Sequence, residues 1–140
     1  MNLILDHLDK LLIAAAIGQL AIAAINMRLD RLLAWNRDLE SLPRLLQEVF
    51  VVHKWFISIT LVIFGVLTLR FAGDIGGGRY EMARWFAAGV GIFWAIRTLI
   101  QWVYYGWEHW RGKARETIVH GILTISYGGT AVVYLVAAFR

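Results

Sequence analysis

The segment that decides the fold runs from Thr117 to Phe139 and reads TIVHGILTISYGGTAVVYLVAAF. It contains no Asp, Glu, Lys or Arg. A bilayer core of about 30 Å is crossed by roughly 20 mostly apolar helical residues, and this segment meets that length. A helix of a soluble bundle would carry a polar face along its whole length. The segment therefore predicts a transmembrane helix.

Three other segments have the same character, so the chain is expected to form four helices, over about residues 8–28, 44–70, 82–107 and 117–139. Of all residues, 59% are hydrophobic and 17% are charged, whereas a typical soluble domain has about 25% charged residues. The pattern predicts an all-α integral membrane protein, an antiparallel bundle of four transmembrane helices that forms a single domain over residues 1–140.

The connections between the predicted helices differ in composition. Between the first two helices, leucines and Trp35 recur at helical spacing among charged residues, which favours an interfacial helical segment or an extension of the first helix. Ser41 and Pro43 indicate the start of the second helix, with Ser41 as the N-cap. Residues 73–78 read GDIGGG. We expect a flexible turn there, because three successive glycines do not hold a helix.

Charge and cysteine content restrict the function classes. The chain has no cysteine, so disulfides and thiolate metal sites are excluded. The net charge of +4 comes from bases at the ends of apolar segments, where they meet lipid headgroups, and it does not indicate nucleic-acid binding. Eight bases flank the first and third connections, and five flank the other side. We expect a bacterial inner-membrane protein with both termini outside the cytoplasm.

Polar residues recur along one face of each predicted helix. The four sets are Gln19, Ala23, Asn26 and Asp30; His53 and Thr60; Arg97, Gln101, Tyr104, Tyr105 and Glu108; and His120, Thr124, Tyr127, Ala131 and Tyr134. Lipid cannot satisfy such groups, so each set should face the bundle interior. Because His53, His109 and His120 fall at the same end of the bundle, the pattern predicts a polar pocket open to one membrane face.

Arg97 is the charged residue deep inside the third predicted helix. It lies roughly 15 Å from the histidine-rich end by helix rise. An arginine at that depth costs at least about 2.5–3.5 kcal/mol on insertion scales. Two interpretations stay open. In one, Arg97 bonds Gln19, Gln101 or a tyrosine and fixes helix packing. In the other, it binds an anionic group such as a haem propionate, a lipid phosphate or a carboxylate.

The histidines allow three interpretations. His53 and His120, on diagonal helices, would ligate a b-type haem, with Arg97, Gln101 and Tyr105 in the same pocket. Alternatively, a non-haem metal ion would bind to the set His53, His109, His120 and Glu48. In the third interpretation the histidines only form hydrogen bonds. No single helix carries a paired histidine motif.

These observations leave three function classes. We expect a small non-enzymatic accessory or structural subunit whose partners, besides the lipid bilayer, are other membrane proteins or further copies of the chain. The second class is a haem- or metal-binding membrane redox protein. The third is an oligomeric transporter or channel, since four helices alone enclose little space.

Overall fold

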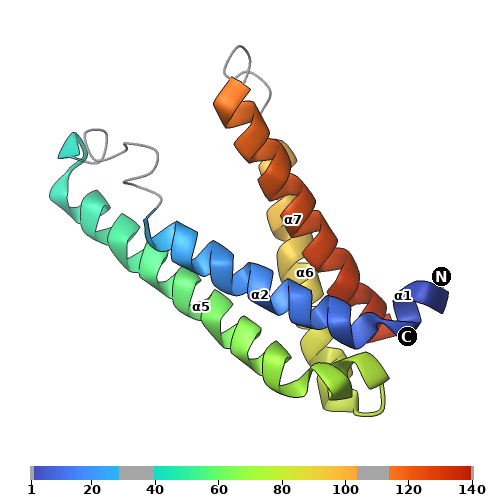
Figure 1. The fold of residues 1–140 in the computed structure, drawn as a ribbon. Coiled ribbons are helices and arrows are strands. Elements are labelled where there is room, and N and C mark those ends of the chain that lie inside the picture. Colours follow the sequence, from blue (N-terminus) through green and yellow to red (C-terminus); the bar gives the residue numbers. More distant parts are fainter. Residues whose placement is uncertain (1, 29–39, 104–113, 140) are drawn as a thin grey trace. The chain divides into compact units, whose positions relative to one another are not determined.

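The computed structural model describes residues 2–28, 40–103 and 114–139, and the regular elements within these ranges are all helices. They are α1 (Asn2–Asp6), α2 (Leu8–Met27), α5 (Arg44–Gly77), α6 (Glu81–Val103) and α7 (Ala114–Phe139), shown in Figure 1. All but α1 are long and apolar enough to cross a membrane. The predicted fold class is confirmed. The interfacial segment predicted after the first helix, and the end of the third helix beyond Val103, lie outside the described residues.

The chain divides into two compact units. One consists of residues 1–13 and 71–140, and we call it the α6–α7 unit; the other consists of residues 14–70, and we call it the α2–α5 unit. Both α2 and α5 pass from one unit into the other. In α5 the passage coincides with Phe71, whose backbone departs from helical angles (φ −116°, ψ 21°) and kinks the helix.

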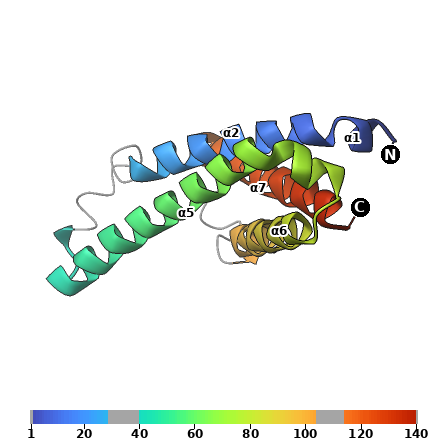
Figure 2. The same ribbon diagram turned by 90° about the horizontal axis from the view of Figure 1, so that it is seen from below.

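In the α2–α5 unit the two helices lie side by side in opposite directions (Figures 1 and 2). Asn26 near the end of α2 bonds to Ser58, and further back along α2 the side chain of Leu20 meets Gly65. A Cβ on Gly65 would lie 2.9 Å from Leu20 and 3.2 Å from the carbonyl oxygen of Ala16. Glycine therefore allows a close approach of the two helices, as small residues commonly do in membranes.

The buried face of α5 in this unit is narrow. Ser58, Leu61, Gly65 and Thr68 are buried at alternating spacings of three and four residues. Most of the remaining apolar side chains of α5 are exposed, among them Trp55, Phe56, Ile57, Ile63 and Val66. An apolar face of this breadth is what a lipid environment tolerates, since lipid tails are as apolar as the side chains.

The α6–α7 unit is also an antiparallel helix pair. Arg84 at the start of α6 donates from Nε to the carbonyl oxygen of Ala138 (3.1 Å), near the end of α7, and Gln101 near the end of α6 meets His120 near the start of α7. Between these contacts Gly91 approaches Leu135. The predicted inward set of the fourth helix is confirmed: Tyr127, Ala131 and Tyr134 are buried, and His120 and Thr124 are half-buried.

The glycine-rich segment differs from its prediction. Instead of forming a turn from residue 73, α5 continues to Gly77, although its end was expected near residue 70. Ala72 and Ile75 are buried, and a Cβ on Gly76 would lie 3.2 Å from the backbone nitrogen of Asp9. This burial, together with the close approach of Gly76 to the start of α2, outweighs the low helix propensity of glycine. Gly78, with φ 66°, then ends the helix in the left-handed conformation that glycine adopts without a steric penalty.

The start of α5 also differs in detail from the prediction. The helix begins at Arg44, and the backbone nitrogen of Gln47 donates to the carbonyl oxygen of Pro43 (3.2 Å). Pro43, rather than Ser41, therefore holds the N-cap position. The side chain of Gln47 donates to the carbonyl oxygen of Leu42 (2.8 Å) and so fixes the entry of the chain into the helix.

Candidate functional site

A hydrogen-bonded chain of side chains joins α6 to α7. The guanidinium of Arg97 donates from Nη1 to Oε1 of Gln101 (3.3 Å), and Nε2 of Gln101 lies 2.8 Å from Nδ1 of His120. Gln101 is buried, whereas Arg97 and His120 are half-buried. The expected bond between Arg97 and Gln101 is thus present. We call these three residues the Arg97–Gln101–His120 relay.

Aromatic rings extend the relay along the interface. The Cζ atom of Arg97 lies 5.0 Å from the ring centroid of Tyr127, within the range of a cation–π contact. Tyr127 stacks on Trp94 with 5.1 Å between ring centroids, and Phe93 meets Trp94 edge to face at 5.4 Å. Trp94 and Tyr127 are buried. A cation is therefore held between a neutral amide and a neutral aromatic ring in a membrane-spanning helix pair.

Local helix geometry explains why these residues meet. Arg97 and Gln101 are four residues apart on α6 and so share a face of the helix. The nearby hydroxyl groups form bonds within their own helices: Thr98 donates to the carbonyl oxygen of Trp94, and Thr124 to that of His120, both at 2.8 Å. Threonine can be buried in a membrane helix in this way without a partner on another helix.

His53 does not lie as the sequence predicted. It was expected to face the interior together with Thr60, but it is exposed and lies beside the buried stripe of α5, not on it. Its Nδ1 bonds the carbonyl oxygen of Val49 at 2.8 Å. Glu48, a predicted metal ligand, is also exposed and pairs with Arg44 at 3.2 Å. An exposed pair of this kind adds about 0–1 kcal/mol of stability.

The remaining predicted ligands, Tyr105 for haem and His109 for a metal ion, lie outside the described residues. Over residues 2–28, 40–103 and 114–139, no group of three or more His, Cys, Asp or Glu side chains is placed to hold a metal ion. His53 and His120 belong to different units of the chain. Their predicted approach, and with it the haem or metal site, stays a prediction.

Ser58 is a polar contact that the sequence reasoning missed. Asn26, half-buried on α2, donates from Nδ2 to Oγ of Ser58 (3.0 Å) and to the carbonyl oxygen of Lys54 (3.3 Å), and Ser58 itself donates to that carbonyl (2.9 Å). Asn26 had been recognised as an inward-facing residue. The signal for its partner was the stripe of small residues that includes Ser58 and Gly65 on α5.

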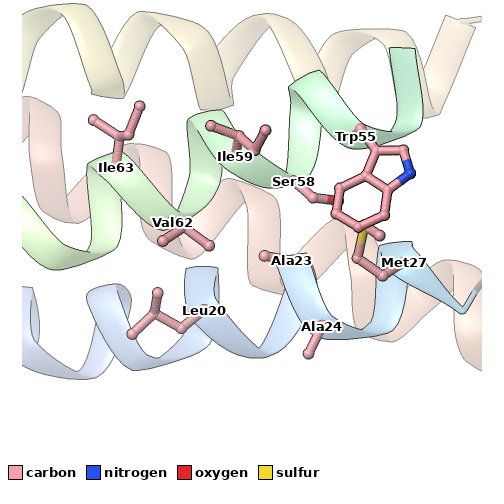
Figure 3. Close-up of a pocket in the computed structure, with 9 residues that line it drawn as sticks. All are labelled: Leu20, Ala23, Ala24, Met27, Trp55, Ser58, Ile59, Val62 and Ile63. Atoms are coloured by element: carbon pink, nitrogen blue, oxygen red, sulfur yellow. The ribbon is translucent and has the colours of Figure 1, made fainter. Parts of the chain in front are cut away.

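An apolar groove of about 340 Å³ lies between α2 and α5 (Figure 3). Its walls are Leu20, Ala23, Ala24, Met27, Trp55, Ser58, Ile59, Val62 and Ile63. Ser58 is the polar residue among them, and its hydroxyl already bonds Asn26 and a backbone carbonyl. The groove therefore suits an apolar ligand, and its lining offers few hydrogen-bonding groups to a polar one.

No protein-family model, curated protein or solved structure matches this chain.

Proposed function

We propose that this protein is a non-enzymatic accessory subunit of a larger membrane complex, and that it docks against another membrane protein through Arg97. The single observation that supports this role is a half-buried cation, Arg97, deep in a membrane-spanning helix, where it bonds the amide of Gln101 and lies over the ring of Tyr127. The proposal agrees with the small size of the chain and with the broad apolar surface of α5.

The depth of Arg97 makes it costly to keep. By helix rise it lies about 24 Å from the start of α6 at Glu81 and about 9 Å from Val103. Insertion scales give a penalty of at least about 2.5–3.5 kcal/mol for a central arginine. The amide of Gln101 and the ring of Tyr127 lower this penalty but bring no negative charge.

Among the acidic side chains that the structure describes in the long helices, Asp9, Glu48, Asp74 and Glu81 each lie near the end of a helix. Ionisable residues inside membranes usually pair with one another. We propose that a transmembrane helix of a partner protein supplies a carboxylate that pairs with Arg97.

Purification from native membranes in mild detergent tests the proposal. We expect the tagged wild-type protein to carry a stoichiometric membrane protein. Arg97→Lys should retain that partner in part, because it keeps the charge, whereas Arg97→Leu should lose it by at least about tenfold. Arg79→Leu is the matched control, since Arg79 is exposed in the connection between α5 and α6. Gel filtration and thermal denaturation should show that the Arg97→Leu variant is folded.

An absorption spectrum of the same wild-type sample separates the redox alternative. A Soret band that corresponds to one haem per chain would assign the protein to the redox class. A partner that remains bound to the folded Arg97→Leu variant would remove Arg97 from the docking surface. A wild-type protein that purifies without any stoichiometric partner would contradict the proposed function.

A further inference from the structure

The groove between α2 and α5 is hollow because small side chains lie between large ones (Figure 3). Ala23 and Ser58 are buried and form its floor, whereas Trp55, Ile59 and Ile63 on its rim are exposed. All of its lining residues belong to the α2–α5 unit. The groove is therefore a feature of one helix pair, and it is open along its rim.

The groove runs inward from one end of the helix pair. Met27 and Trp55 lie at that end, and Leu20 and Ile63 lie at the other (Figure 3). With its 20 residues, α2 spans about 30 Å, so in a bilayer it ends at Met27 close to a membrane interface. Trp55 suits this depth, because tryptophan rings are enriched at interfaces. Leu20 lies roughly 10 Å deeper by helix rise, so the groove falls within one leaflet, whose apolar core is about 15 Å thick.

The volume of the groove favours a single hydrocarbon chain over a helix. By the van der Waals separation of carbon atoms, an extended hydrocarbon chain is about 4–5 Å thick, and about 11 Å of it fills on the order of 200 Å³. A helix with its side chains is about 10–12 Å across and fills roughly 1,000 Å³ over the same length. The groove measures about 340 Å³. It therefore accommodates one acyl chain but only a small part of a helix.

A cation lies beside the interfacial end of the groove. Arg28 directly follows Met27 and is exposed. Its backbone nitrogen donates to the carbonyl oxygen of Ile25 (3.0 Å), so the chain is still coiled there. Arg28 comes four residues after Ala24, a lining residue, and this spacing places both on one side of α2. A guanidinium binds phosphate oxygens through two parallel hydrogen bonds, so Arg28 suits a lipid phosphate at this depth.

We infer that the α2–α5 groove is a binding site for one anionic phospholipid, with an acyl chain in the groove and the headgroup phosphate at Arg28. The walls and the bulk lipid are equally apolar, so the groove contributes packing and the headgroup contributes the selectivity. One arginine near the membrane surface raises the affinity for an anionic lipid by about fivefold. The site does not include Arg97, so the inference is independent of the proposed function.

Native mass spectrometry of the full chain, released from nanodiscs, tests the headgroup. The nanodiscs contain equal amounts of phosphatidylglycerol and phosphatidylcholine with the same acyl chains. We expect one retained lipid per chain and a preference of about fivefold for phosphatidylglycerol. The preference should disappear in Arg28→Gln and persist in Arg28→Lys. Arg44→Gln is the matched control, because Arg44 is exposed at the start of α5 and does not line the groove.

Two results of this measurement would overturn the inference. One is equal retention of the two lipids by the wild-type protein. The other is the same loss of preference in Arg44→Gln as in Arg28→Gln, which would show that the preference follows the net charge of the chain.

Filling the groove tests the acyl-chain site. Ala24→Phe places a ring in the groove, and because Ala24 is exposed the ring need not disturb the buried contact between the helices. We expect the retained lipid to fall by at least about tenfold. Ala14→Phe is the matched control, since Ala14 is exposed on the same helix and does not line the groove. Circular dichroism should show that both variants are folded, and an Ala24→Phe variant that retains lipid like Ala14→Phe would contradict the site.

Photolabelling locates the lipid on the wild-type protein and needs no variant. Phosphatidylglycerol with a diazirine in its acyl chain should cross-link within residues 20–27 and 55–63. Cross-links spread evenly over the exposed apolar residues of the long helices would overturn the inference. So would a lipid-free dimer that Ala24→Phe dissociates, because a second copy of the chain would then occupy the groove. Ala24→Phe should still carry the partner that Arg97→Leu loses, so the two proposals can fail separately.

Discussion

Gly91 on α6 provides the sharpest test of how α6 packs on α7. A Cβ at this position would lie 2.8 Å from Cδ2 of Leu135, 2.9 Å from its Cγ and 3.2 Å from its backbone nitrogen. The first distance is about 0.6 Å short of ordinary van der Waals contact. The side chain of Leu135 cannot relieve the contact with its own backbone, so Gly91→Ala must move α7 or strain it.

Overpacking of this kind costs about 1–3 kcal/mol. Gly89→Ala is the matched control, because a Cβ at Gly89 on the same helix meets nothing within 4 Å. Both variants gain the same helix propensity, about 1 kcal/mol, so this gain cancels in the comparison. On the scale of soluble domains, Gly91→Ala should melt about 3–10 °C below Gly89→Ala.

Thermal unfolding in detergent, followed by circular dichroism, measures this difference. Leu135→Ala should restore part of the lost stability when combined with Gly91→Ala, since the two sites are in contact and their effects should not add. Equal melting temperatures for Gly91→Ala and Gly89→Ala would refute the close approach of the two helices, and with it the geometry that places Gln101 beside His120.

Three further outcomes are expected. In a double-mutant cycle Asn26→Ala and Ser58→Ala should show a coupling of about 0.6–1.7 kcal/mol, the range for hydrogen bonds between membrane helices, and a coupling of zero would exclude their bond. Arg84→Gln should lower the unfolding free energy by about 0.5–1 kcal/mol through loss of a charged bond to the end of α7, a loss that chemical denaturation would detect. Because the chain has no native cysteine, single cysteines that replace Gly77 and Lys113 can be labelled selectively. The two cysteines should react from opposite membrane faces. Reaction from the same face would contradict the four-helix topology.

The helices could be predicted from the sequence because long apolar runs of bilayer length have few alternatives. The inward face of α7 could also be predicted, since Tyr127 and Tyr134 mark one side of an otherwise apolar helix. Likewise, the spacing of Arg97 and Gln101 predicted their bond. In each case a polar side chain had to avoid lipid, and its position identified the buried face.

The orientation of α5 could not be predicted in the same way. The pattern of His53 and Thr60 predicts an inward face, but near a helix end an imidazole can bond its own backbone, as His53 does to Val49. The face that is buried carries Ser58, Gly65 and Thr68, which are marked by small size and not by polarity. In lipid both faces of such a helix are apolar, so hydropathy does not distinguish them.

The continuation of α5 through its glycine-rich end was missed for another reason. Local propensity predicts a turn over GDIGGG, and nothing in that segment shows that Ala72 and Ile75 are buried or that Gly76 lies close to the start of α2. Tertiary packing decided the outcome, and a contact between Gly76 and Asp9, which are far apart in the sequence, leaves no local signal.

Native mass spectrometry of the protein released directly from its own membrane tests the central claim most directly. The claim predicts a defined complex of this chain with another membrane polypeptide, which is present for the wild-type protein and for Arg79→Leu and is lost for a folded Arg97→Leu variant. Release of the chain alone, or bound only to haem, would contradict the accessory role. A complex that persists in the folded Arg97→Leu variant would contradict docking through Arg97.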